Sequence, residues 1–403
     1  MNSYWALLKT RGVARIMSAQ LVARFPSGML SLAFLLHIER IHHSYGAAGL
    51  VLAAMSIGQA IAGPLTSRWM GVWGMRTVLV LTATICVTAL GVIAYAPKLP
   101  VPVYMAVGLI AGLSYPPIQP AVRTIYPKMV NSKQLTPLFS LDASAQELIW
   151  VAGPVITTFV ATQISPVVAI TLAIAFMVGG GIWFVTSPAV GRVRIPRSKR
   201  KIGAVLLRPP VLLATVCGFL LVGACAAIEA AVVATFGHDS PDSGFVLAIF
   251  AIGSLIGGLA LGHLPIGPWA LARRMFIMFI GMALAAASLN FWWLALMLAL
   301  SGIGIAPALA VMFTIVSASV KFSETAEAYG WIGTGQLIGA ALGSAAAGFM
   351  IDGFDAHGGI WVAVAFALLG FVIPIIFRRA HPDLRGKDAS PIPDTEPIQS
   401  IRP

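Results

Sequence analysis

The sequence predicts an all-α polytopic membrane protein, with twelve transmembrane helices arranged as two pseudo-symmetric six-helix bundles. The composition supports this fold class, because 58% of the 403 residues are hydrophobic, only 10% are charged and the mean hydropathy is +0.90. Soluble domains have about 45–50% apolar and about 25% charged residues. Long apolar stretches are therefore interpreted as membrane spans, each of which needs about 20 residues to cross the hydrocarbon core.

Apolar windows between turn and charge signals give the spans in order. Twelve windows are found, at residues 14–38, 46–67, 77–96, 102–123, 137–162, 166–187, 210–236, 243–263, 272–288, 291–318, 326–350 and 358–377. An even number of spans places both termini on the same side of the membrane. No cleavable signal peptide is expected, because the first window is long and lacks a small-residue cleavage site.

The distribution of Lys and Arg indicates which side this is. If the N-terminus is cytoplasmic, 23 of the 26 Lys and Arg residues lie at the cytoplasmic side, and only Arg40 and Lys98 fall outside. This bias follows the positive-inside rule and predicts cytoplasmic termini in the inner (plasma) membrane. Topology thereby accounts for the net charge of +12, so nucleic acid is not expected as a partner.

Polar breaks divide the chain into parts. Residues 190–208 form a basic cytoplasmic linker between one six-helix bundle at 1–189 and a second at 209–377. We expect the linker to anchor at anionic lipid headgroups. Residues 378–403 are polar and proline-rich and are predicted to form a disordered cytoplasmic tail.

An internal repeat indicates that the two bundles are equivalent. With a shift of 195 residues, 49–68 aligns with 244–263 at eight identical positions, among them Gly58 with Gly253. A shift of 189 aligns 144–150 with 333–339 and places Glu147 opposite Gln336. Spans 2 and 8 therefore correspond, as do spans 5 and 11. Two six-span halves in parallel repeat are one of the architectures on which secondary transporters are built.

With these features the chain resembles the major facilitator superfamily over essentially its full length. The stretch GPLTSRWMGVWGMR, at 63–76, is similar to the signature loop of that family between spans 2 and 3. Gly63, Arg68 and Arg76 fit a variant with a longer turn, whereas Ser67 stands where the family has an acid. The resemblance implies a gating role for these positions, without the charge lock ascribed to the missing acid.

Span 5 bears on the direction of transport. Antiporter-type members of the family carry a Gly-Pro pair in this span, and Gly153 and Pro154 occupy that place, although the downstream glycines are replaced. Pro154 has no N–H, so the carbonyl of Trp150 loses its helical partner and the helix is pushed to bend. The pair therefore indicates either an antiporter-type gate or an ordinary packing kink.

Charged residues within the spans are candidate functional groups, because a charge near the bilayer centre costs about 2.5–3.5 kcal/mol on insertion scales. Glu147 is the leading candidate for a proton carrier. It and Arg24 each lie about 10 residues from the cytoplasmic end of their span, or about 15 Å. Burial favours the neutral form of Glu147 and a nearby Arg24 favours its carboxylate, so a conformational change could load or release a proton. The alternative is a permanent ion pair between the two side chains.

Three further acids are assigned from their depth. Asp142 lies about 140° around the helix from Glu147 and is expected to pair with Arg123 of span 4, although a proton role stays open. Glu229, in the outer half of span 7, is a second proton or cation site or a polar contact. Glu327 and Arg123 lie near cytoplasmic span ends and are assigned to gating.

Aromatic and amide side chains in the spans that the resemblance places around the cavity are candidates for substrate binding. With Arg24, these are Phe25, Tyr115, Trp150, Trp331 and Gln336. Trp and Tyr also gather at membrane interfaces for amphipathic reasons, so an interfacial role stays open. The prolines at 116, 117 and 120 are expected to break span 4.

Together these features predict a secondary active transporter similar to twelve-span bacterial drug:proton antiporters of the multidrug-resistance type. It would exchange protons for a small amphipathic molecule, as a monomer in the bilayer. Proton symport or facilitated uptake of a sugar or metabolite is the alternative, since the same fold supports it. An enzyme is not expected, because GxxxxGK[ST] and HExxH are missing and the seven histidines are scattered. No cofactor or metal is predicted, and Cys86, Cys217 and Cys225 are interpreted as reduced thiols.

Overall fold

The structure is a computed structural model that describes residues 2–96, 98–237 and 241–394. The chain is helical almost throughout, and by length and hydropathy ten helical segments of the described residues can cross a membrane. Two further spans are not counted among these ten, because one helix is short and another segment contains two spans. Helix α13 (Ala270–Ala285) has 16 residues, or about 24 Å. Helix α16 (Thr325–Ile376) is interrupted at Phe354 and Asp355, whose backbones are non-helical, and so provides spans 11 and 12.

The first half contains the six spans that were predicted, two of them in pieces. Its helices are α2 (Val13–Arg24) with η1 (Phe25–Gly28) and α3 (Leu30–His42) as span 1, α4 (Tyr45–Trp73), α5 (Met75–Tyr95), α6 (Val101–Leu113) with α7 (Ile118–Ile125) and η2 (Tyr126–Lys128) as span 4, α8 (Ser132–Gln163) and α9 (Pro166–Val185). A short helix α1 (Asn2–Lys9), which was not predicted, precedes span 1. Prolines explain both breaks, because Pro26 begins the tight η1 turn and Pro116 and Pro117 cannot donate helical hydrogen bonds.

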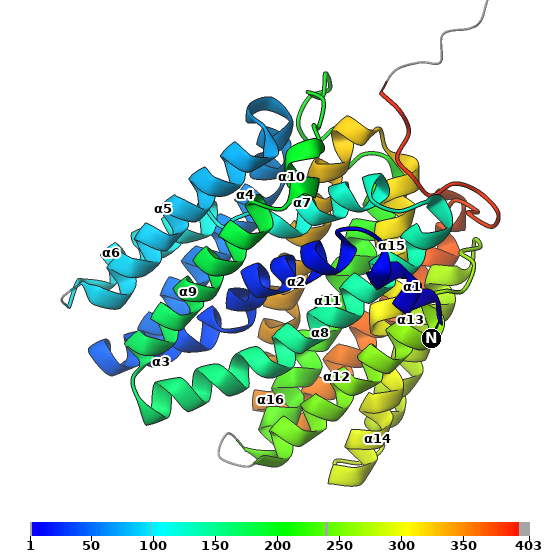
Figure 1. The fold of residues 1–403 in the computed structure, drawn as a ribbon. Helices are drawn as coiled ribbons and strands as arrows, with labels where there is room; N and C mark the ends of the chain where they lie inside the picture. Colours follow the sequence, from blue (N-terminus) through cyan, green and yellow to red (C-terminus); the bar gives the residue numbers. More distant parts are fainter. Residues whose placement is uncertain (1, 97, 238–240, 395–403) are drawn as a thin grey trace, which may run out of the picture.

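The second half repeats this order. Its helices are α11 (Pro209–Phe236), α12 (Pro241–Leu261), α13, α14 (Phe291–Gly302) with α15 (Ile305–Ser319) as span 10, and the two parts of α16. The linker begins with α10 (Pro188–Arg192) and continues without regular helix to α11. In Figure 1 the helices of the first half fan out to the left and those of the second half run to the bottom, whereas the linker and the tail lie at the top. We call the end with the linker the basic end.

The hydrophobic core shows where the halves join. One cluster of buried residues contains side chains of both halves, such as Phe139 and Phe313. A second cluster is confined to the first half and is built from the far parts of its spans, for example Phe34, Leu90 and Ile170. The two halves therefore share a core near the basic end, whereas towards the opposite end the first half packs around a core of its own.

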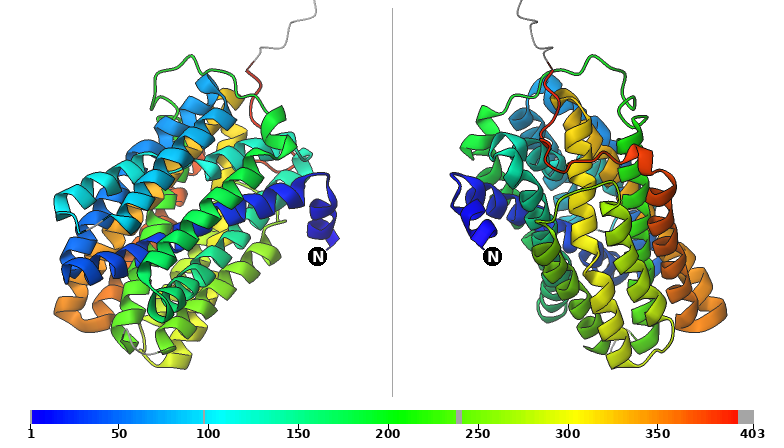
Figure 2. Two further views of the ribbon diagram at one scale, coloured as in Figure 1. Left: turned by 60° about the vertical axis from the view of Figure 1, so that its left-hand side comes forward. Right: turned by 90° about the vertical axis from the view of Figure 1, so that its right-hand side faces the viewer.

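The tail differs from the prediction of a disordered segment. Residues 378–394 fold back along the second half at the basic end, beside the linker (Figure 2). Ile392 exchanges backbone hydrogen bonds with Val320 and Phe322, at 2.9 and 3.0 Å, and the N–H of Leu384 donates to the carbonyl of Ile266 at 2.9 Å. His381 is buried, which lowers the pKa of its imidazole and keeps the ring neutral near pH 7. These contacts offset the low hydrophobicity on which the prediction relied. The final residues, 395–403, lie outside the described residues.

Candidate functional site

A buried ionic cluster lies in the first half, around Asp142 of α8. This carboxylate has no exposed surface and accepts hydrogen bonds from Gln20 at 3.1 Å, Arg24 at 3.4 Å, Arg123 at 3.0 Å and Tyr126 at 3.1 Å. The predicted contact between Asp142 and Arg123 is thus present. These four donors come from spans 1 and 4, so the carboxylate of Asp142 joins both spans to α8.

Arg24 has a different partner from the one considered in the sequence. It contacts Gln20, Asp142 and Gln146, and the six ion pairs between described residues do not include one with Glu147. The permanent ion pair of Arg24 with Glu147 is therefore wrong for this state. The reason is helical geometry, since Asp142 and Gln146 are four residues apart on one face of α8 and Glu147 is not on it.

The break in span 1 is fitted closely to α8. A Cβ atom on Gly28 would lie 2.3 Å from the carbonyl oxygen of Ile149, and one on Gly153 would lie 2.7 Å from the carbonyl carbon of Gly28. Only glycine allows the two backbones to approach this far. Gly153 therefore serves close packing against η1, next to Pro154, which α8 accommodates without ending.

Glu147 is directed towards the second half of the molecule. Its carboxyl group interacts with the hydroxyl of Ser254 on α12, and it lies within electrostatic range of Glu229 on α11. Cys225, one turn before Glu229, is in range of both acids. Glu147 is half-buried and Glu229 is exposed, and among the described residues neither has a cationic ion-pair partner. Two carboxyl groups, one from each half, thus lie within electrostatic range of each other.

The first seam between the halves, α4 against α16, carries charge. Arg68 binds Glu327 at 2.8 Å and also donates to the carbonyl of Arg200 in the linker. Glu327 is 2% exposed and accepts a further bond from the backbone N–H of Gly203 at 2.7 Å. Deeper in the seam, the hydroxyl of Thr334 donates to the carbonyl of Ala60 at 2.7 Å. Arg68 and Glu327, both assigned to gating, therefore join the two halves and the linker at the basic end.

The signature stretch is built differently from the prediction. Helix α4 continues to Trp73, and only Gly74, at φ 87°, separates it from α5, so a longer turn is wrong. The hydroxyl of Ser67 donates to the carbonyl of Gly63 at 2.6 Å within its own helix, and takes no part in the seam. Arg76 donates to the carbonyl of Val185 at 3.1 Å and so ties α5 to α9 within the first half.

The second seam, α8 against α12, is uncharged at its centre. The carbonyl of Gly258 accepts hydrogen bonds from Ser140 at 2.7 Å and from Tyr4 of α1 at 3.2 Å. A Cβ atom on Gly258 would lie 1.8 Å from the hydroxyl of Ser144. Gly63, its counterpart in the repeat, faces α16 in the first seam, where a Cβ atom would lie 3.2 Å from the hydroxyl of Thr334 and 3.3 Å from the carbonyl oxygen of Gly330. This pair of repeated glycines thus lies where each half packs on the other.

The structure places the other predicted binding residues as follows. The ring centroids of Phe25 and Phe176 lie 4.9 Å apart beside the break in span 1, with the rings tilted by 42°. The hydroxyl of Tyr115, at the break in span 4, is buried without a partner in the described residues. Trp150 is 50% exposed, and Gln336 contacts Gly218 of α11. Trp331 departs from the prediction, because it lies at the basic end, bonded to Glu327 and packed against Gly203 of the linker.

Some contacts were missed in the sequence. Glu324 binds Arg208 at 2.7 Å and Arg200 at 3.3 Å, which ties the linker to the start of α16. Two features of the sequence could have indicated these contacts: Glu324 lies three residues before Glu327, and the linker contains seven basic residues that could pair with it. Arg274, counted only towards topology, is 5% exposed and donates to the carbonyl of Pro307 at 2.8 Å. The described residues contain no group of three or more His, Cys, Asp or Glu that could hold a metal ion.

Comparison with known proteins places this architecture. The family described as Major Facilitator Superfamily matches residues 16–289 and 226–402. Among solved structures, the human organic anion transporter MFSD10 is 17% identical with a TM-score of 0.70, covering 90% of this chain and 99% of that one. A bacterial homologue of the iron transporter ferroportin in an outward-facing state is 14% identical with a TM-score of 0.74, covering 92% and 100%. The proton:xylose symporter XylE, bound to 6-bromo-6-deoxy-D-glucose, is 13% identical with a TM-score of 0.70, covering 94% and 98%. The comparison with curated proteins gave no match. These identities show a shared fold.

Proposed function

Since the chain belongs to the major facilitator superfamily and is a secondary transporter, we propose that it exports a small amphipathic molecule in exchange for protons. The position of Glu147 carries this proposal. Along α8, Ser140 and Ser144 meet Gly258 inside the second seam, and Glu147 meets Ser254 one turn further on. The acid thus lies where the seam ends, so its protonation can be coupled to whether the halves close or separate.

The proposed orientation follows from the positive-inside bias. The basic end faces the cytoplasm and is sealed by the two seams, and the space between the halves opens to the outside. We infer that Glu147, which is half-buried, and Glu229, which is exposed, are reached from the outer solution in this state. A proton taken up there neutralises Glu147, which lowers the cost of moving it into the apolar seam when the halves rock towards the inward-facing state.

Among the described residues, no cationic side chain forms an ion pair with Glu147, which supports an exchange mechanism. Arg24 and Arg123 are already bound to Asp142, so a proton or a cationic substrate is what can neutralise Glu147. Occupation by one excludes the other, which is the condition for antiport. Asp142, by contrast, is bound to Arg24 and Arg123 and holds spans 1, 4 and 5 together.

The experiment uses the full chain reconstituted in liposomes with an internal pH indicator and a panel of cationic, neutral and anionic amphipathic dyes. We expect dye flux against an imposed proton gradient, and loss of the pH-driven flux in Glu147→Gln with dye exchange retained. Glu39→Gln, the same chemical change at the end of span 1, is the matched control and should behave as wild type. Dye and protons moving in the same direction would instead support uptake by symport, and an unchanged Glu147→Gln variant would remove the role of that residue.

A further inference from the structure

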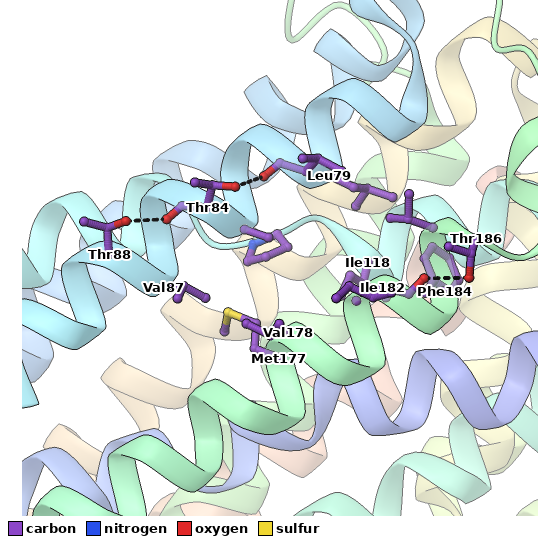
Figure 3. Close-up of a pocket in the computed structure, with 15 residues that line it drawn as sticks. Leu79, Thr84, Val87, Thr88, Ile118, Met177, Val178, Ile182, Phe184 and Thr186 are labelled. Carbon is purple, nitrogen blue, oxygen red and sulfur yellow. Dashed lines mark hydrogen bonds between the residues drawn. The ribbon is translucent and has the colours of Figure 1, made fainter.

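A groove on the outside of the first half, away from the seams, has no part in this mechanism. It lies between α5 and α9 and has a volume of about 380 Å³, within the usual range of about 300–1,000 Å³ for small-ligand sites. Figure 3 shows Thr84 and Thr88 of α5 on one side and Met177 and Ile182 of α9 on the other. Pro116 and Ile118, which flank the break in span 4, form its floor.

The lining admits only an apolar occupant. Its polar side chains are threonines whose hydroxyls are already used, since Thr84 donates to Val80 and Thr186 to Ile182, both at 2.8 Å, and Thr88 donates to Thr84 at 2.9 Å (Figure 3). Along α5 the lining extends from Leu79 to Thr88, which corresponds to about 14 Å of helix. The groove is therefore long and apolar and has no free donor.

The end of the groove at the basic end carries a positive charge. Arg76 is exposed, lies three residues before Leu79, and donates its Nε–H to the carbonyl of Val185, a lining residue of α9. Within the described part of the chain no carboxylate pairs with it. Its terminal nitrogens, which lie beside Gly191, have no carboxylate to neutralise their charge. An apolar groove of about 14 Å, which starts near the basic end and has a cation at that end, matches one kind of molecule.

We propose that this groove is a binding site for an anionic phospholipid, with one acyl chain between α5 and α9 and the phosphate at Arg76. Since the acyl chain of the lipid packs against the floor of the groove at the break in span 4, bound lipid stabilises the geometry of that break in this state. Any conformation that alters the break must then bind the lipid more weakly, because the two equilibria are linked.

Two glycines of α9 provide a test with a matched control. Gly181 lines the groove and Gly179 does not, yet a Cβ atom at either position would meet nothing within 4 Å. A side chain at either site therefore begins in open space, but only Gly181→Phe lies in the lining of the groove. The full chain is placed in nanodiscs that contain phosphatidylglycerol with a diazirine in the acyl chain, and crosslinked peptides are mapped by mass spectrometry after illumination.

We expect crosslinks concentrated at 79–88 and 177–186, lost in Gly181→Phe and retained in Gly179→Phe. With Arg76→Gln, or with the phosphatidylcholine form of the probe, crosslinking in the groove should decrease while crosslinking elsewhere is unchanged. Crosslinks spread evenly over all lipid-facing helices, or unaffected by Gly181→Phe, would overturn the proposal. Equal labelling by the two lipids would overturn the part assigned to Arg76.

Discussion

The two seams that join the halves are related by the internal repeat but are held together by different chemistry. In the first, Arg68 of α4 binds Glu327 of α16 across the junction. In the second, α8 meets α12 through hydroxyl groups that donate to the carbonyl of Gly258. The glycine contacts are shared by both seams, so close backbone packing belongs to the common scaffold. The charged residues, by contrast, are not shared and belong to one seam only.

The helices that form the seams also differ in their charged residues. Helix α8 carries Asp142 and Glu147, whereas the matching part of α16 carries Trp331 and Gln336. Arg123, which binds Asp142, lies 3.4 Å above the ring of Phe313 in the second half. The second seam therefore lacks a charge pair across it but rests on a charged cluster on one side. The repeat therefore determines where the halves touch. The acids that can take up a proton, and the ion pair that holds the halves together, depend on individual residues that are not repeated.

The largest effect is expected from Asp142→Asn, which removes the anion shared by Arg24 and Arg123. Two buried guanidinium groups would then lack a counter-charge, and breaking such a pair costs about 3–5 kcal/mol. Thermal unfolding of the purified protein measures this loss. Trp331→Phe, at the matching position of the second half, should cost far less. Equal losses in the two variants would mean that the ionic cluster contributes no more than ordinary packing.

A smaller effect, on the conformational equilibrium, is expected from Glu327→Gln. The side chain of Arg68 is 21% exposed and that of Glu327 3%, so screening limits the cost of the lost pair to about 1–2 kcal/mol. The basic end should open more often. Because Cys225 lies one turn before Glu229 on α11, its alkylation rate reports how often the opposite end is open, and it should fall by at most about 5- to 30-fold. A rate unchanged from wild type would show that the first seam is not held by this pair.

The smallest effect is expected from Ser140→Ala in the second seam. One neutral hydrogen bond is lost, worth about 0.5–1.5 kcal/mol, and Tyr4 still donates to the same carbonyl of Gly258. Alkylation of Cys225 should therefore slow by less than in Glu327→Gln. If the order of the two variants were reversed, the neutral seam would be the main lock and the comparison above would be wrong.

Local and periodic signals were sufficient for the fold. All twelve predicted windows coincide with helices, and the repeated glycines, Gly58 and Gly253, both lie against a helix of their own half, at Leu109 and Ala299. The breaks in spans 1 and 4 also follow from local chemistry, because Pro26, Pro116 and Pro117 are visible in the sequence.

The partners of charged residues could not be predicted in the same way. Arg24 and Glu147 share a depth in the membrane, but the choice of Asp142 as partner depends on the rotation of α8, which depth does not specify. The contacts of Glu324 and of the tail required the path of the linker and of residues 378–394 over the basic end. Such paths depend on tertiary packing, which cannot be predicted from composition.

If the basic end is cytoplasmic and closed while Glu147 and Glu229 are open to the outside, the nearby thiol of Cys225 should react from outside. Cys86 and Cys217 are fully buried, so Cys225 is the cysteine expected to react. Intact cells that express the full chain are treated with a membrane-impermeant maleimide, and inside-out vesicles are treated in parallel. We expect labelling of Cys225 from outside in intact cells and slower labelling in the vesicles. Labelling confined to the inside-out vesicles would contradict the account.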